Sequence, residues 1–140
     1  MRTVRDDDGT RYLLLKESTE SSLVRDPETG EQRHVPNADL KPVDGESPLA
    51  TAAEAVPDAA RQVITATHDD RALGLLVELD ERGPLSVAEL LSAYDLCESD
   101  LHGLLAEFRA AGLLTEAQIH GQRGYDTTET ARDGLAHLRD

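Results

Sequence analysis

The chain has 140 residues, enough for one ordinary domain or two very small ones, and 39% of them are hydrophobic. With no Trp and one Phe, it lacks the aromatic platforms on which single-stranded nucleic acids stack, which argues against an RNA-binding sheet. Its 28 acidic and 14 basic residues give a net charge of -14. Because Asp6 to Asp8 follow Arg5 where a signal peptide would have an apolar run, we expect no membrane span and a cytoplasmic location.

The sequence pattern of the N-terminal part, residues 1–46, is typical of short extended segments. Strands are predicted at residues 12–16, 21–25, 32–36 and 39–43. Pro27 presets φ and Gly30 accepts a left-handed exit, so a tight turn is predicted between two of these strands. Six apolar residues can cover a small core: Leu13, Leu15, Leu23, Val24, Val35 and Leu40. We therefore predict a small antiparallel β-meander, which is available to a protein partner.

Residues 47–68 are predicted to form an Ala-rich helical linker. Gly45 to Pro48 have the composition of a connecting segment, and Pro57 separates two helical pieces, residues 49–56 and 58–67. These pieces could form a dimer interface or simply bridge the two halves.

Three helices are predicted in succession after the linker, at residues 71–82, 87–94 and 98–111. Asp69 is placed to cap the first, and Ser86 with Glu89 has the spacing of a capping box for the second. In the third helix, apolar residues from Leu101 to Phe108 form one stripe. Apolar residues at this spacing are typical of a helix that packs against two others.

A β-hairpin and a closing helix are predicted to complete the chain. Gly112 ends the third helix, after which residues 113–119 and 125–127 can pair across a Gly-rich loop at residues 120–124. The closing helix spans residues 128–138 and has an apolar face of Ala131, Leu135 and Leu138.

The last half of the chain resembles a known family. Ala111-Gly112-Leu113-Leu114, followed at hairpin length by Tyr125-Asp-Thr-Thr-Glu129, is similar to a signature of winged helix-turn-helix transcription regulators. The resemblance covers residues 69–140. It implies binding of duplex DNA through the third helix (98–111) and the wing (113–127), by a homodimer. The expected fold class is α+β, with the N-terminal meander (domain 1–46) followed by a winged helix-turn-helix domain.

The whole chain also resembles an uncharacterised domain family of halophilic archaea, which brings no known activity. The resemblance rests on Arg11-Tyr-Leu-Leu-Leu-Lys16, the turn of residues 25–30 and the run of residues 96–102. The composition, acidic and with Lys only at positions 16 and 41, is similar to that of halophilic proteins. Residues 69–140 hold six Arg against fifteen Asp or Glu, but at molar salt repulsion of phosphate is screened within about 3 Å.

Five residues are candidates for DNA binding in this interpretation. Ser99 and His102 lie early in the third helix and can reach base edges or phosphates, although both are also ordinary surface residues. Arg109 can reach phosphate. Arg123, expected at the wing tip, can enter a minor groove or contact the backbone together with Gln122.

Each arginine also has a purely structural interpretation, and a second function remains open. Arg109 can pair with Glu107 or Glu116 on a solvated surface, and Arg123 can be an ordinary loop charge. The acidic third helix, with Gly103 where a base-reading side chain often stands, motivates the alternative of a protein-protein interaction module that does not bind DNA.

We expect no enzyme activity, no metal and no cofactor. The five histidines lack metal-ligand spacing, and there is no Gly-rich phosphate loop and no nucleophile motif. The single Cys97 excludes an internal disulfide and a multi-cysteine zinc site, and we expect it to be a small buried residue of the turn before the third helix.

Overall fold

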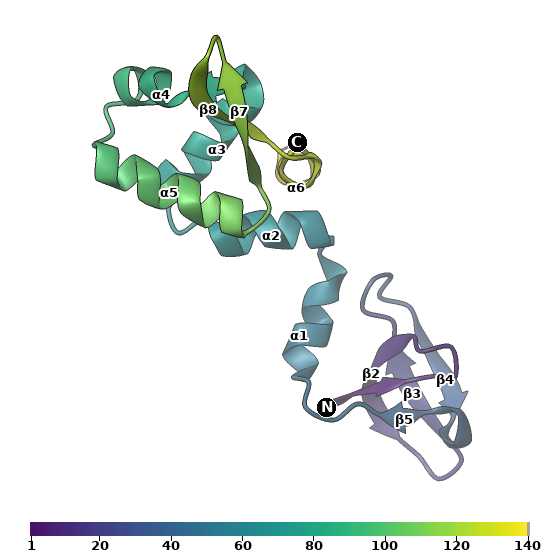
Figure 1. The fold of residues 1–140 in the computed structure, drawn as a ribbon. Coiled ribbons are helices and arrows are strands. Elements are labelled where there is room, and N and C mark those ends of the chain that lie inside the picture. Colours follow the sequence, from purple (N-terminus) through teal and green to yellow (C-terminus); the bar gives the residue numbers. More distant parts are fainter. Residues whose placement is uncertain (140) are drawn as a thin grey trace. The chain divides into compact units, whose positions relative to one another are not determined.

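The computed structural model describes residues 1–139 and divides at Val56/Pro57 into two compact units, each shown with its elements in Figure 1. The first unit is built on an antiparallel sheet, and the second combines helices with a small sheet, so the predicted α+β class and N-terminal antiparallel sheet are confirmed. The predicted linker of residues 47–68 is shared between the units. Helix α1 (Pro48–Ala52) and the short 3-10 helix η2 (Ala53–Ala55) belong to the first unit, and α2 (Asp58–Ala66) belongs to the second.

Five antiparallel strands form the first unit's sheet in the order β4-β3-β2-β1-β5. Their bounds are β1 (Arg2–Arg5), β2 (Arg11–Glu17), β3 (Ser21–Arg25), β4 (Gln32–Pro36) and β5 (Lys41–Pro42). Strand β1 was not predicted. The predicted strand at residues 39–43 is reduced to β5, because Asn37–Asp39 form a 3-10 turn, η1, before it.

The two faces of this sheet are covered differently. One face carries the apolar core, formed by Val4, Tyr12, Leu14, Val24 and Val35. On the other face Thr3 pairs with Leu13 across the strands, and the Thr3 and Thr51 hydroxyl oxygens lie 2.7 Å apart in a buried hydrogen bond to α1. Leu15 and Leu23, predicted in the core, are only half-buried, because the register of β2 against β3 shifts between Leu14 and Lys16.

Within residues 57–139, the second unit contains five helices whose ends follow the predicted caps closely. They are α2, α3 (Asp70–Arg82), α4 (Val87–Ala93), α5 (Glu98–Ala110) and α6 (Glu129–Leu138). The Asp69 carboxylate accepts a hydrogen bond from the Ala72 amide at 2.9 Å, and Ser86 and Glu89 form the capping box. Gly112 has a φ of 76°, which is the left-handed exit expected of a glycine after a helix.

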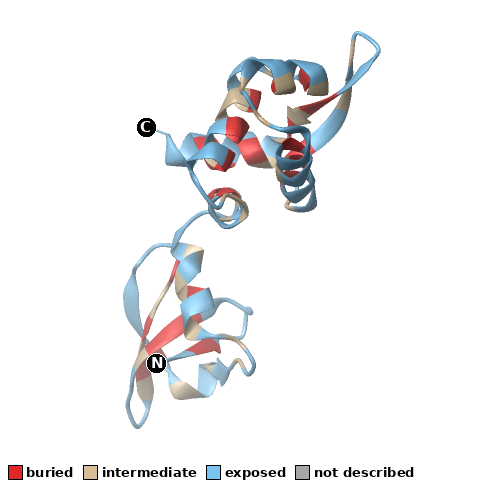
Figure 2. Ribbon diagram, turned by 90° about the vertical axis from the view of Figure 1, so that its left-hand side faces the viewer, coloured by how far each residue is buried: buried red, intermediate tan, exposed pale blue. Residues whose placement is uncertain are grey.

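Three strands form the second unit's sheet in the order β6-β8-β7. They are β6 (Leu85–Ser86), β7 (Leu114–Ile119) and β8 (Gln122–Thr127). One apolar core joins this sheet to the helices, and Figure 2 shows its buried residues inside the unit and the exposed tip of the β7–β8 hairpin.

Helix α6 packs on α2 through a close contact at Gly134. A Cβ atom there would lie 2.4 Å from the Ala59 carbonyl oxygen, so only glycine fits. Leu138 lies one turn beyond this contact and is 45% exposed. Of the three residues predicted on the apolar face of this helix, Ala131 and Leu135 are buried and Leu138 is only partly covered.

Candidate functional site

Helix α5 presents a row of small side chains to solvent. Its buried stripe is Leu101, Leu105 and Phe108. On the opposite side of the helix, at the spacing of successive turns, the exposed residues are Ser99, Gly103, Ala106 and Ala110. A Cβ atom at Gly103 would meet no other atom within 4 Å. The backbone of α5 can therefore come unusually close to whatever covers this face.

The turn before α5 differs from the prediction at its cysteine. Cys97 is exposed, and its sulfur accepts a hydrogen bond from the Asp100 amide at 3.4 Å, so it caps α5 where a buried residue was expected. Asp95, two residues earlier, has a φ of 53°. This left-handed residue turns the chain between α4 and α5.

The β7–β8 hairpin closes through two residues, His120 and Gly121, whose φ values are 52° and 78°. Positive φ at both central residues is the mark of a type I′ turn, which matches the twist of a hairpin. The predicted loop of residues 120–124 was too long. Arg123 consequently lies within β8 opposite Gln118, and its predicted position at the tip was wrong.

Gly124 and Gly121 lie close together in this hairpin but have different roles. A Cβ atom at Gly124 would lie 2.5 Å from the Leu85 carbonyl oxygen and 2.9 Å from the Ser86 Cα atom. This glycine is required by the close approach of β8 to β6, and the turn itself uses only Gly121.

Arg109 of α5 and Arg123 of β8 converge on one carboxylate. The Glu116 Oε1 atom of β7 accepts hydrogen bonds from Arg109 at 3.0 Å and from Arg123 at 2.7 Å. Arg123 also donates to the Tyr125 hydroxyl at 3.1 Å, with its guanidinium 5.8 Å from the ring centre. The hydrogen bond to Glu116 raises the pKa of Arg123 above its usual value. Two positive charges and one negative charge thus meet where the helix adjoins the hairpin.

The other three candidate residues are exposed but lie apart from this cluster. The His102 Nε2 atom is 3.6 Å from the Glu98 carboxylate, and the Ser99 hydroxyl oxygen is 3.5 Å from the Cys97 sulfur. Gln122 precedes Arg123 in β8 and so lies on the opposite face of the hairpin. The structure therefore brings together Arg109 and Arg123 alone among the five candidates.

Glu116 and Tyr125 are the partners that the sequence interpretation did not assign to Arg123. Glu116 had been considered only for Arg109. The signal that could have identified both residues is the strand register. A two-residue turn places Glu116 opposite Tyr125, on the same face of the hairpin as Arg123 and two positions along the strands from it.

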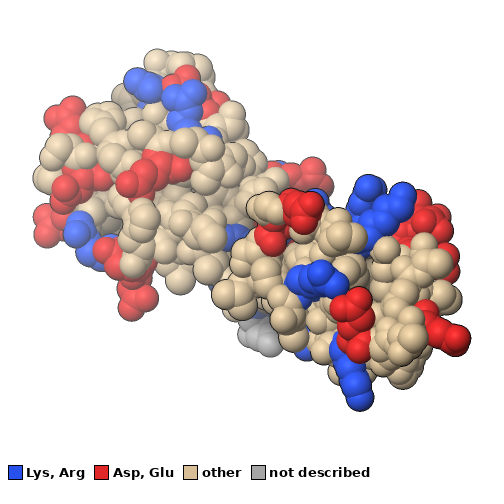
Figure 3. All heavy atoms as spheres, turned by 90° about the horizontal axis from the view of Figure 1, so that it is seen from below, with Lys and Arg blue, Asp and Glu red and all other residues tan. Residues whose placement is uncertain are grey.

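Other exposed side chains of α5 are acidic. Asp100 and Glu107 are exposed on α5, and the Glu107 carboxylate lies 3.2 Å from the His68 Nε2 atom. In the view of Figure 3, basic side chains are interspersed with acidic ones. The exposed part of α5 and the hairpin therefore offers local positive charge at the two arginines in a mainly acidic setting.

Comparison with known proteins assigns a family and no activity. A family model described as a family of unknown function, DUF7346, matches residues 1–139. No curated protein and no solved structure matches the chain. Throughout residues 1–139, the helices are too short or too polar to cross a membrane.

Proposed function

The chain belongs to the DUF7346 family, and we propose that its second unit is a winged helix-turn-helix domain that binds duplex DNA as a transcription regulator. The succession α3, β6, α4, α5, β7, β8, α6 is the order expected of such a domain, with α5 as recognition helix and the hairpin as wing. The observation that carries the proposal is the convergence of Arg109 and Arg123 on Glu116. Both guanidinium groups stand at the place where a recognition helix and its wing would meet one DNA backbone.

The exposed face of α5 suits the groove that this function requires. The major groove of B-DNA, about 12 Å wide, admits one helix, and small side chains let that helix approach closely. Ser99 and His102, in the first two turns of α5, would contact base edges or phosphates. Arg109 and Arg123 would exchange the Glu116 carboxylate for phosphate oxygens, because the planar guanidinium binds both groups in the same geometry.

The acidic setting determines the salt at which this binding is expected. Repulsion between phosphates and exposed carboxylates extends over about 10 Å at 0.1 M salt and about 3 Å at 1 M. We therefore propose that the protein works in the molar salt of a halophilic cytoplasm, to which its composition is suited. Two phosphate contacts predict a shallow dependence of log K on log salt, with a slope of about -2 once the repulsion is screened.

The test is fluorescence anisotropy of labelled genomic duplex fragments with full-length protein, over a range of KCl up to molar concentrations. We expect saturable binding by the wild-type protein. The Arg109→Ala, Arg123→Ala double variant should bind more weakly, and the slope of log K against log salt should be shallower by about 2. Arg139→Ala is the matched control, because Arg139 is also an exposed arginine of this unit but pairs with Glu81 of α3, at 2.7 Å.

DNA binding is refuted if the wild-type protein shows no saturable binding at any salt concentration, or if the double variant and Arg139→Ala behave alike. In cells, chromatin immunoprecipitation of the tagged protein should give discrete peaks that the double variant loses.

A second function is favoured by the small residues of α5. The row from Ser99 to Ala110 would let another helix pack closely, and the flanking Asp100 and Glu107 would select a basic partner. In this case a protein should co-purify with the chain at molar salt. Gly103→Leu should release that partner because the added side chain blocks the close approach, whereas the Arg109→Ala, Arg123→Ala variant should retain it.

We also propose that the chain acts as a homodimer, as closed two-fold association is the commonest form of soluble oligomer. Ile64 of α2 and Leu138 of α6 are 51% and 45% exposed and provide apolar surface for it. Sedimentation equilibrium should give twice the monomer mass, and Ile64→Asp should shift the equilibrium to monomers. A monomer at every concentration measured would refute this assembly.

A further inference from the structure

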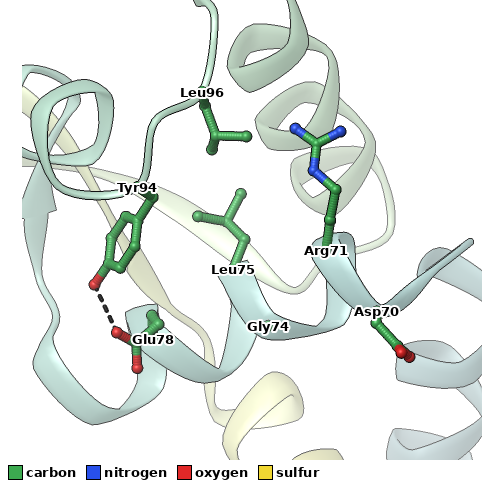
Figure 4. Close-up of a pocket in the computed structure, with 7 residues that line it drawn as sticks. All are labelled: Asp70, Arg71, Gly74, Leu75, Glu78, Tyr94 and Leu96. Atoms are coloured by element: carbon green, nitrogen blue, oxygen red, sulfur yellow. Dashed lines mark hydrogen bonds between the residues drawn. The ribbon is translucent and has the colours of Figure 1, made fainter.

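A pocket of about 310 Å³ lies on the second unit between α3 and the segment that joins α4 to α5 (Figure 4). This volume is at the lower end of the range found for small-molecule sites. Its lining is formed by Asp70, Arg71, Gly74, Leu75, Glu78, Tyr94 and Leu96. The pocket is separate from the arginine cluster of α5 and the hairpin, whose residues do not line it.

The floor of the pocket is apolar and is held open by a glycine. Leu75 is 5% exposed and faces Leu96 across the pocket. Gly74 lies in the interior of α3, where glycine weakens a helix relative to Ala. A Cβ atom at Gly74 would meet no other atom within 4 Å, so no packing contact excludes a side chain there. Without that side chain, the space beside Leu75 remains accessible.

Two different polar groups flank this floor. Arg71, Leu75 and Glu78 are spaced to lie on one face of α3, and Figure 4 shows Arg71 on one side of Leu75 and the Tyr94–Glu78 pair on the other. The Tyr94 hydroxyl donates a hydrogen bond to the Glu78 carboxylate at 2.9 Å. Partial burial, followed by this hydrogen bond, raises the pKa of Tyr94 above its usual value. Glu78 is thus already engaged by a donor.

Arg71 differs from the other six arginines of this unit. Those six each donate to a carboxylate, a hydroxyl or a carbonyl oxygen: Arg61, Arg82, Arg109, Arg123, Arg132 and Arg139. Arg71 makes no ion pair and no side-chain hydrogen bond with any of residues 1–139. The neighbouring Asp70 side chain points away from it in Figure 4. In a chain with twice as many acidic as basic residues, a guanidinium left free beside an apolar pocket is unusual.

We propose that this pocket binds a small organic carboxylate, with its anionic group on Arg71 and its apolar body on Leu75 and Leu96. The guanidinium fork matches a carboxylate in two parallel hydrogen bonds. The apolar floor supplies the contact that simple inorganic anions cannot use, so it selects anions with an aromatic or aliphatic body. Glu78 and Asp70 disfavour a second negative charge on the ligand, which makes a monocarboxylate the best match.

The test is a titration of the full-length, ¹⁵N-labelled protein with sodium benzoate at constant ionic strength, followed by amide chemical shifts. We expect saturable shifts centred on Gly74, Leu75 and Leu96. Benzyl alcohol, which keeps the ring and lacks the charge, and benzylamine, which reverses it, should bind at least about tenfold more weakly, since a hydrogen bond to a charged group is lost.

Two variants locate the site. Arg71→Gln should weaken benzoate binding at least about tenfold by removing the charged donor. Gly74→Leu should abolish it by filling the pocket, whereas Gly103→Leu, a matched substitution at the other open helical glycine of this unit, should leave benzoate binding unchanged.

The proposal is overturned if benzoate gives no saturable shifts, if benzyl alcohol or benzylamine binds as well as benzoate, or if Arg71→Gln binds benzoate like the wild type. All of these readouts are independent of DNA, so they stand or fall separately from the function proposed above.

Discussion

The two units of this chain are stabilised in different ways. The second unit has fifteen buried residues in one core cluster, whereas the sheet of the first unit has five. The first unit supplements its small core with polar contacts, such as the buried Thr3–Thr51 hydrogen bond and the ion pairs of Arg11 with Glu46 and Glu54. The comparison suggests that exposed polar residues of the second unit are less needed for folding and are available for binding.

The largest expected effect is the loss of the central aromatic side chain of the second unit. Phe108 is fully buried at the base of α5, so Phe108→Ala should lower the free energy of unfolding by about 3–5 kcal/mol. Urea denaturation followed by residue-resolved amide signals should show the change in residues 57–139. A loss below about 1 kcal/mol would contradict the view that this unit depends on its apolar core.

A smaller effect is expected from the polar contact of the first unit. Thr51→Val leaves the buried Thr3 hydroxyl without a partner, which should lower the free energy of unfolding by about 1–3 kcal/mol. The matched control is the Thr3→Val, Thr51→Val double variant, in which both polar groups are replaced by methyl groups of similar shape. It should recover most of the loss when measured by the same urea titration. Equal losses in the single and double variants would show that packing of the threonines, and not their hydrogen bond, holds α1 on the sheet.

A gain in the free energy of unfolding of about 1 kcal/mol is expected from a substitution on the exposed face of α5. Gly103→Ala adds a methyl group in open space and removes the helix penalty of glycine, so it should raise the free energy of unfolding by about 0.5–1 kcal/mol. Gly124→Ala is the contrasting variant and should destabilise the unit, because its Cβ atom would lie 2.5 Å from the Leu85 carbonyl oxygen. Destabilisation by Gly103→Ala would mean that α5 is not free on this face.

Local signals in the sequence were sufficient to predict the helices of the second unit. The Asp69 cap, the Ser86–Glu89 capping box and the Gly112 exit each involve residues within a few positions of one another, and all three are present. Backbone groups at helix ends need such partners whatever the rest of the fold does, so their residue types are informative.

Features that depend on distant contacts could not be predicted in the same way. Gly121 and Gly124 have the same local appearance, yet one forms the turn and the other makes room for β6. Placing Arg123 required knowing which glycine does which, because the turn length sets the register of every later residue in β8. The pocket beside Gly74 was missed for a related reason, since Tyr94 and Leu96 approach α3 only in the folded chain.

The smallest effect on stability, and the sharpest test of the comparison, is expected at Glu116. Its ion pairs with Arg109 and Arg123 are about half exposed, and such pairs contribute about 0–1 kcal/mol, so Glu116→Gln should scarcely change the free energy of unfolding. It removes the carboxylate that competes with phosphate for both guanidinium groups, and DNA affinity should therefore rise, with a steeper dependence on salt.

Glu81→Gln is the matched control for this variant, because Glu81 also pairs with an exposed arginine, Arg139, but lies on α3. Both variants change the net charge equally, so a gain in DNA affinity confined to Glu116→Gln would identify the convergence of α5 and the hairpin as the binding surface. Equal gains would instead indicate a general effect of net charge and would contradict a specific role for Arg109 and Arg123. If Glu116→Gln lowered the free energy of unfolding as much as Phe108→Ala, Glu116 would belong to the residues that stabilise the second unit. This result would contradict the view that its exposed surface is free to bind.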